Sequence, residues 1–161
     1  LHFNYSMTVE IQTIEQVKTV TKPWGQEKWI QPGSSQYPFV LKELTLLAGQ
    51  RTSLQVHEYK SESIIILKGT GSLLHHKKLF DCQRFQANGY NEEELLELIG
   101  DLQSVRLSPG MVFHTPPGTV HRMIAKTDLV YIEASTTELD DVIRLQDDRK
   151  RPHGKIDSEH K

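Results

Sequence analysis

Four polar residues are spaced so that they could hold a metal ion. In the segment from Ser53 to Tyr59 apolar and polar residues alternate, which predicts a strand with Gln55 and His57 on one face. Glu62 begins the next apolar run, so a hairpin can return its carboxylate to that face, and His121 follows a tight turn at the head of another segment. One amide oxygen, two imidazoles and one carboxylate can then converge.

This mixed set of nitrogen and oxygen ligands suits a borderline divalent cation. Zinc, iron, manganese, cobalt and nickel are all chemically admissible, and the ligand types alone do not choose among them. As a Lewis acid, such an ion would polarise a carbonyl group and stabilise the negative charge that develops on its oxygen. Tyr59 shares the predicted strand face, so its phenol is a candidate to contact the ion or a substrate.

The elements that would position these residues are β-strands. From residue 39 onward, short segments rich in Val, Ile, Leu and Thr are separated by turns that contain Gly and Pro, which is typical of an all-β fold. We expect strands at Phe39–Leu47, Ser53–Tyr59, Ser63–Leu67, Met111–Thr115, Val120–Ala125 and Leu129–Ala134. The segment Asn91–Gly100 has a capping Asn, an acidic first turn and a terminal Gly, which predicts a short helix inserted between two strands.

Size and composition favour one soluble domain. The chain has 161 residues, of which 37% are hydrophobic and 25% are charged, so it can bury a core without help from disulfides. We expect an N-terminal arm at 1–19, the domain itself at 20–148, and a charged tail at 149–161 that is flexible or lies on the surface.

Charge and hydropathy argue against two classes of partner. Lys and Arg total 19 against 21 Asp and Glu, so the chain lacks the basic excess of a nucleic-acid-binding protein. No apolar run approaches the roughly 20 residues of a membrane-spanning helix. The single cysteine, Cys82, rules out an internal disulfide and agrees with a reducing compartment, so we expect a cytoplasmic protein.

The candidate ligands stand within two glycine-bounded motifs. The first motif contains Gly49, His57, Glu62 and Gly69, and the second contains Gly110, Pro117, Gly118 and His121. This pattern resembles the cupin superfamily, which implies a double-stranded β-helix, that is, a jelly-roll barrel, with the helical insertion near 91–100. Tyr59 departs from the pattern, because it stands where many cupins have a second metal-binding histidine.

Two further segments narrow the resemblance. Lys22–Trp29 and Asp140–Asp148 look like the opening and closing segments of the cupin domain of type II mannose-6-phosphate isomerases and their stand-alone relatives. The similarity covers about 20–151, and the set Gln55, His57, Glu62 and His121 is similar to the zinc ligands of phosphomannose isomerases. It also implies that Lys42 and Arg144 handle the substrate and hold its phosphate, with Tyr59 and Arg51 as further substrate-binding candidates.

The resemblance leads to the hypothesis of a metal-dependent sugar-phosphate isomerase of the mannose-6-phosphate type, active in carbohydrate metabolism and paired as a homodimer. A general base must move a proton between two carbons, and Glu43, Glu133 and a metal-bound water are candidates. One alternative is a non-catalytic cupin that binds a sugar or sugar nucleotide in polysaccharide metabolism. The other is a cupin oxygenase.

Overall fold

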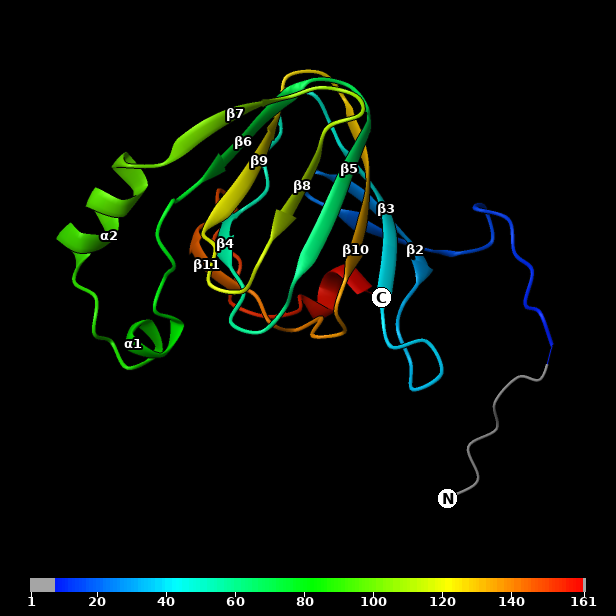
Figure 1. The fold of residues 1–161 in the computed structure, drawn as a ribbon, viewed down its shortest axis with the longest axis horizontal. Helices are drawn as coiled ribbons and strands as arrows, with labels where there is room; N and C mark the ends of the chain where they lie inside the picture. Colours follow the sequence, from blue (N-terminus) through cyan, green and yellow to red (C-terminus); the bar gives the residue numbers. More distant parts are fainter. Residues whose placement is uncertain (1–7, 161) are drawn as a thin grey trace.

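Two antiparallel β-sheets face each other across the interior of the molecule (Figure 1). The computed structural model describes residues 8–160. The first sheet has the order β1 (Lys18–Lys22), β2 (Gly25–Gln31), β3 (Val40–Leu46), β10 (Leu129–Ser135), β5 (Glu62–Lys68) and β8 (Val112–Thr115). The second has the order β11 (Ile143–Gln146), β4 (Leu54–Val56), β9 (His121–Ala125), β6 (Gly71–His75) and β7 (Gln103–Leu107). This arrangement confirms the predicted all-β jelly-roll barrel.

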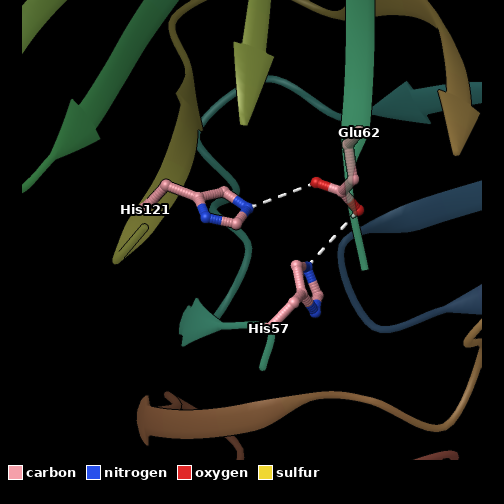
Figure 2. A group of neighbouring side chains, drawn as sticks. All are labelled: His57, Glu62 and His121. Carbon is pink, nitrogen blue, oxygen red and sulfur yellow. Dashed lines mark ion pairs between the residues drawn. The ribbon is translucent and has the colours of Figure 1, made fainter. Parts of the chain in front are cut away.

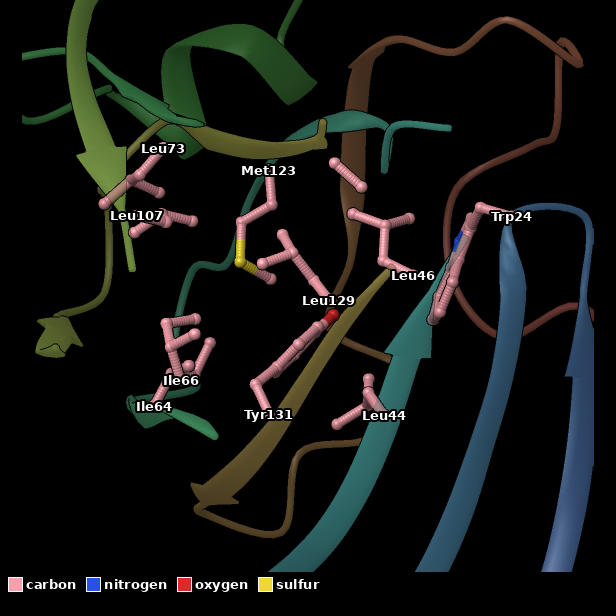
Figure 3. Packing of buried hydrophobic residues seen from close by; sticks show 11 residues of the cluster. Trp24, Leu44, Leu46, Ile64, Ile66, Leu73, Leu107, Met123, Leu129 and Tyr131 are labelled. Carbon is pink, nitrogen blue, oxygen red and sulfur yellow. The ribbon is translucent and has the colours of Figure 1, made fainter. Parts of the chain in front are cut away.

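Strand alternation fills one end of the barrel with apolar side chains. In β3, for example, Leu44 and Leu46 are buried between the sheets while their neighbours are only partly covered. The core cluster, most of which is labelled in Figure 3, consists of Trp24, Leu44, Leu46, Ile64, Ile66, Leu73, Leu107, Met123, Ala125, Leu129 and Tyr131. Burying each of the larger aliphatic side chains contributes about 1.5–3 kcal/mol, so this end of the barrel holds the two sheets together.

The inward-facing residues change from apolar to polar at one level of the barrel. In each of four strands, an apolar and a polar residue two positions apart both face inward. The pairs are Leu44 and Lys42 in β3, Ile64 and Glu62 in β5, Met123 and His121 in β9, and Tyr131 and Glu133 in β10. The strand register brings the polar positions together, since Lys42 is the Cα partner of Glu133, and Glu62 is the partner of Ser135 two residues further along β10. The second end of the barrel is therefore a polar pocket.

The insertion between β6 and β7 contains two helices, α1 (Cys82–Gln86) and α2 (Glu92–Gly100). The predicted helix at 91–100 is confirmed as α2, where the side chains of Asn91 and Glu94 form a reciprocal capping box. A second apolar cluster joins the insertion to β4 and β11, and its buried members are Leu54, Val56, Phe80, Cys82, Val120 and Ile143. Within the described part of the chain, neither helix is long and apolar enough to cross a membrane.

The strand expected at Ser53–Tyr59 is shorter in the structure and ends at Val56. The physical reason is Asp141, whose carboxylate accepts hydrogen bonds from the backbone N–H groups of residues 58, 59 and 60, which a strand would offer to a neighbouring strand. Five strands were not predicted, namely β1, β2, β6, β7 and β11. Sequences such as KTVTK in β1 and GQEKWIQ in β2 carry few apolar residues, so the pattern of hydrophobicity does not mark them.

The last described residues, 151–160, lie against the polar end of the barrel, and we call them the C-terminal strap. They include the short 3-10 helix η1 (Asp157–His160), which contacts β1 and appears red in Figure 1. Flexibility of the tail stays a prediction. Residues 1–7 of the predicted N-terminal arm, and Lys161, lie outside the described residues.

Candidate metal centre

Three side chains from separate parts of the chain converge at the polar end of the barrel (Figure 2). Glu62 begins β5, His121 begins β9, and His57 lies in the loop after β4. Nε2 of His57 is 3.4 Å from Oε1 of Glu62, and Nε2 of His121 is 3.4 Å from Oε2 of the same carboxylate. All three residues are buried, and one ligand atom from each lies within 4.8 Å of the other two. One cation can therefore contact all three.

Backbone carbonyls orient both imidazoles toward Glu62. Nδ1 of His57 is hydrogen-bonded to the carbonyl oxygen of Asp141, and Nδ1 of His121 is 2.9 Å from that of Thr119. Because a carbonyl only accepts, each Nδ1 carries a proton, and Nε2 of each ring is directed at the carboxylate. Within residues 8–160, Nε2 of His57 is buried and has no hydrogen-bond partner. Two imidazole nitrogens that face one carboxylate in this way fit a bound divalent metal.

A buried lysine lies beside this cluster. Nζ of Lys60 forms an ion pair with Oε1 of Glu62 and another with Oε1 of Glu133, at 3.3 Å. Burial raises the pKa of Glu62, but Lys60 and the two histidines lower it by more, so this carboxylate stays ionised and able to ligate a metal. Burial lowers the pKa of Lys60, but Glu133 and Glu62 raise it by more, so the ammonium stays charged.

Gln55, the fourth ligand candidate, lies next to this group. It is the Cα partner of His121, and its side chain lines the same pocket. Oγ of Ser53 donates a hydrogen bond of 2.8 Å to Oε1 of Gln55, which leaves that oxygen a second lone pair for another partner. The structure thus brings Gln55 and His121 onto neighbouring strands on the side of the pocket opposite Glu62.

A second charged group lines the pocket on β1, β2 and β3. Nζ of Lys42 lies 3.2 Å from Oε2 of Glu27 and 4.3 Å from the centre of the Trp29 ring. The indole Nε1 of Trp29 donates to the same Glu27 oxygen at 2.8 Å. Burial raises the pKa of Glu27, but Lys42 and Lys22 lower it by more, so the carboxylate stays ionised. Lys42 faces the pocket as the resemblance implies, with its charge compensated by Glu27.

The remaining substrate-binding candidates have different positions. Arg144 lines the pocket, and its Nη1 donates to the carbonyl oxygens of Pro152 and Gly154. Arg51 is paired with Asp148, at 2.5 Å, and does not line the pocket. Tyr59 is 63% exposed and is also absent from the pocket wall. The structure therefore places Arg144 in the pocket that contains the metal-ligand candidates and leaves the other two outside it.

Sequence reasoning did not find Lys60 and Glu27 as members of the site. Lys60 stands between His57 and Glu62 within the first motif, which is a signal of position only, because alternation cannot place a residue in a loop. Glu27 lies in a strand that hydropathy does not reveal. Of the general-base candidates, Glu133 lines the pocket and Glu43 does not.

Comparisons with known proteins agree with this architecture. A family model described as "Mannose-6-phosphate isomerase C-terminal" matches residues 10–99, a range that contains Gln55, His57 and Glu62 and ends before His121. No curated protein matches the chain.

Solved structures of low sequence identity share the fold. The capsular polysaccharide assembling protein CapF from Staphylococcus aureus superposes with a TM-score of 0.59 at 15% identity, over 81% of this chain and 32% of that one. KdgF from Halomonas sp. gives 0.58 at 16% identity, over 83% and 98% of the two chains. Ectoine synthase from P. lautus gives 0.55 at 11% identity, over 80% and 78%. The chain thus spans about a third of the CapF chains that it matches.

Proposed function

Because the chain belongs to the mannose-6-phosphate isomerase C-terminal family of cupins, we propose that it is a metal-dependent isomerase that interconverts an aldose phosphate and its ketose. The observation that carries the proposal is the pair of imidazole Nε2 atoms, each 3.4 Å from one oxygen of a buried carboxylate, at the base of a pocket rich in basic residues. Gln55, His57, Glu62 and His121 would hold the ion. When bound, a divalent metal there supplies Lewis acidity toward a substrate oxygen.

The charge of the pocket favours an anionic substrate. Six basic side chains line it against three acidic ones: Lys22, Lys42, Lys60, Arg144, Arg151 and Lys155 against Glu27, Glu62 and Glu133. Asp147 and Glu159, which are not among these lining residues, pair with Arg151 and Lys22, so the remaining excess of positive charge is small, and its sign favours an anionic ligand. Mannose 6-phosphate is the first substrate to test, because the family is described by that reaction.

Glu133 is the residue that we assign to proton transfer between the two reacting carbons. Burial raises the pKa of Glu133, and the neighbouring charge of Glu62 raises it further, by more than Lys60 and Lys42 lower it. A carboxylate with a raised pKa is a stronger base at neutral pH than an ordinary one. Lys60, which stays protonated, lies 3.3 Å from the same carboxyl group and would stabilise negative charge on the substrate oxygens.

The test combines metal analysis with a coupled assay. The purified protein is analysed for bound metal, and turnover of mannose 6-phosphate is followed as fructose 6-phosphate with and without a chelator. We expect Glu133→Gln to lower kcat by about 10²–10⁴-fold, while the matched control Glu43→Gln, which changes a residue outside the pocket, keeps wild-type activity. Absence of turnover in every metal form would refute the isomerase proposal.

A second candidate function is binding of a sugar or sugar nucleotide without turnover. The observation that favours it is that both cations expected to handle the substrate are already engaged, Lys42 with Glu27 and Arg144 with two backbone carbonyls. Ligand binding without isomerisation in the same assay would support this candidate. The oxygenase alternative gains no such support, because Tyr59, at the position of the second histidine, faces solvent.

A further inference from the structure

The C-terminal strap (151–160) is anchored to the barrel by backbone contacts. Nη1 of Arg144 donates to the carbonyl oxygens of Pro152 and Gly154, the second at 2.8 Å. The backbone N–H of Arg144 donates to Nδ1 of His153 at 3.0 Å, and that of Gly154 donates to the carbonyl of Val142 at 2.8 Å. These contacts place the first half of the strap beside β11, one wall of the pocket.

A set of ion pairs holds the second half of the strap across the pocket. Glu159 pairs with Nζ of Lys22 at 2.8 Å and with Nη1 of Arg151 at 3.3 Å, and Arg151 also pairs with Asp147 at 2.7 Å. The side chains of these four residues are between 5% and 11% exposed, so solvent screens the pairs less than it would at an open surface. Glu159 thus connects the strap to β1 on the far side of the pocket.

The strap contributes directly to the pocket wall. Arg151, Gly154, Lys155, Ile156 and His160 all line the pocket that contains the metal-ligand candidates. Among the residues that the structure describes, Lys155 forms no ion pair, whereas the other basic side chains of the wall contact a carboxylate or backbone carbonyls. Lys155 is an exposed residue at the pocket wall, and in the described part of the chain its ammonium is left available for a ligand.

We propose that the C-terminal strap is part of the ligand-binding site, with Lys155 contacting the negative charge of a bound anion and Glu159 holding the strap closed over it. The strap lies outside the 10–99 range of the family match. The inference takes the class of ligand, a phosphorylated sugar, from the proposed function, whereas the closing role of the strap does not depend on catalysis.

Charge reversal in the intact chain tests the Lys155 contact. Lys155→Glu is compared with Lys150→Glu, which makes the same change of net charge nearby in the chain but outside the pocket. Binding of mannose 6-phosphate and of inorganic phosphate is measured by calorimetry at low ionic strength, and metal content and circular dichroism check that each variant is intact. We expect Lys155→Glu to weaken binding by about tenfold or more and Lys150→Glu by less than about twofold.

Glu159→Gln tests the closure. The substitution removes both ion pairs of Glu159 at nearly constant volume, so we expect trypsin to cut after Lys155 faster than in the wild type, and added mannose 6-phosphate to slow that cut in the wild type. His160 packs edge-on against Trp29, with ring centres 5.2 Å apart, so a change in tryptophan fluorescence would report the same opening.

The outcomes separate this inference from the isomerase proposal. If the protein shows no turnover but binds mannose 6-phosphate in a way that depends on Lys155, the result would support the proposed role of the strap and refute the isomerase proposal. Turnover with equal affinities in the Lys155→Glu and Lys150→Glu variants would refute the strap and leave the isomerase standing. A wild-type protein that binds neither anion would overturn the strap as well.

Discussion

Asp141 fixes the loop that carries His57 and Lys60, and its removal should be costly. Its carboxylate accepts hydrogen bonds from the backbone N–H groups of Glu58 at 2.9 Å, Tyr59 at 2.7 Å and Lys60 at 2.8 Å. Its own carbonyl oxygen is bonded to Nδ1 of His57. One aspartate therefore positions a ligand candidate and the cation beside the metal site.

The magnitude follows from what Asp141→Ala leaves unpaired. The N–H of Lys60 belongs to a buried residue, and a buried unpaired donor costs about 1–3 kcal/mol. The N–H groups of Glu58 and Tyr59 are more accessible to water, so each loss costs about 0.5 kcal/mol. We expect a free energy of unfolding lower by about 2–4 kcal/mol, which for a domain of this size lowers Tm by roughly 4–16 °C.

The same substitution should weaken the metal site. The backbone carbonyl that orients His57 stays in place, but the loop 58–60 between His57 and Glu62 loses its anchor, so we expect metal affinity to fall by less than the roughly 10–100-fold that follows removal of an orienting group. Asp141→Asn keeps the shape but offers one acceptor oxygen and two amide donors, so we expect an intermediate loss of stability. Chemical unfolding with chelator present, and competition with a metal indicator, measure the two effects separately.

The pH dependence gives a further check on the role of Asp141. Burial raises the pKa of its carboxyl group, but the three backbone donors lower it by more, so the folded-state pKa lies below the unfolded value of about 3.9. The stabilisation is present above that unfolded value and is lost as the pH falls through the folded pKa. The stability difference between wild type and Asp141→Asn should accordingly shrink below about pH 4.

Asp140→Ala is the matched control, because the neighbouring side chain is exposed and no hydrogen bond of its carboxylate is seen among residues 8–160. We expect this control to change stability by less than about 0.5 kcal/mol. If Asp141→Ala were as stable as Asp140→Ala at neutral pH, Asp141 would not be the residue that fixes this loop.

Three other predictions concern the site and the barrel. His121→Ala should remove bound metal from the purified protein, and wild-type metal content by elemental analysis would contradict the ligand assignment. Lys60→Met leaves two buried carboxylates without their shared cation. We expect urea unfolding of the chelator-treated variant to show a free energy of unfolding lower by about 3–5 kcal/mol, and added zinc to restore part of it. Gly69 has φ +86°, and a Cβ added there would lie 2.0 Å from the backbone oxygen of Asp128, so we expect Gly69→Ala to lower the Tm in a thermal melt. Gly100→Ala is the control, because a Cβ added at Gly100 meets no atom within 4 Å, and we expect it to leave the Tm unchanged.

Oligomeric state can be measured directly. The homodimer stays a prediction from the cupin resemblance, and light scattering on the purified protein tests it.

Local sequence pattern was enough to predict an all-β fold and to name the candidate ligands, and the resemblance to cupins implied the barrel. Alternation with period two marks which side of a strand is buried, so β3, β5 and β10 could be located from their Val, Ile and Leu residues. Gln55, His57, Glu62 and His121 could be named because the spacing of polar residues around two glycine-bounded turns is itself a local property. The predicted strand limits were less accurate. The end of β4, for example, is set by Asp141, which lies 81 to 83 residues further along the chain than the N–H groups that it binds.

Tertiary structure alone decided the rest of the site. Glu62, Lys60 and Glu133 meet because β5 pairs with β10, and the resulting pKa directions follow from burial and from charges that neighbour one another only in the folded barrel. The strap depends on an ion pair between Lys22 and Glu159, which are 137 residues apart. Its sequence is charged and nearly free of apolar residues, which predicts a tail that is flexible or lies on the surface. The structure shows which partners those charges have on the barrel, and that the strap forms a wall of the pocket. Periodicity reports which face of an element is buried, but it carries no information about which distant charge will complete a pair.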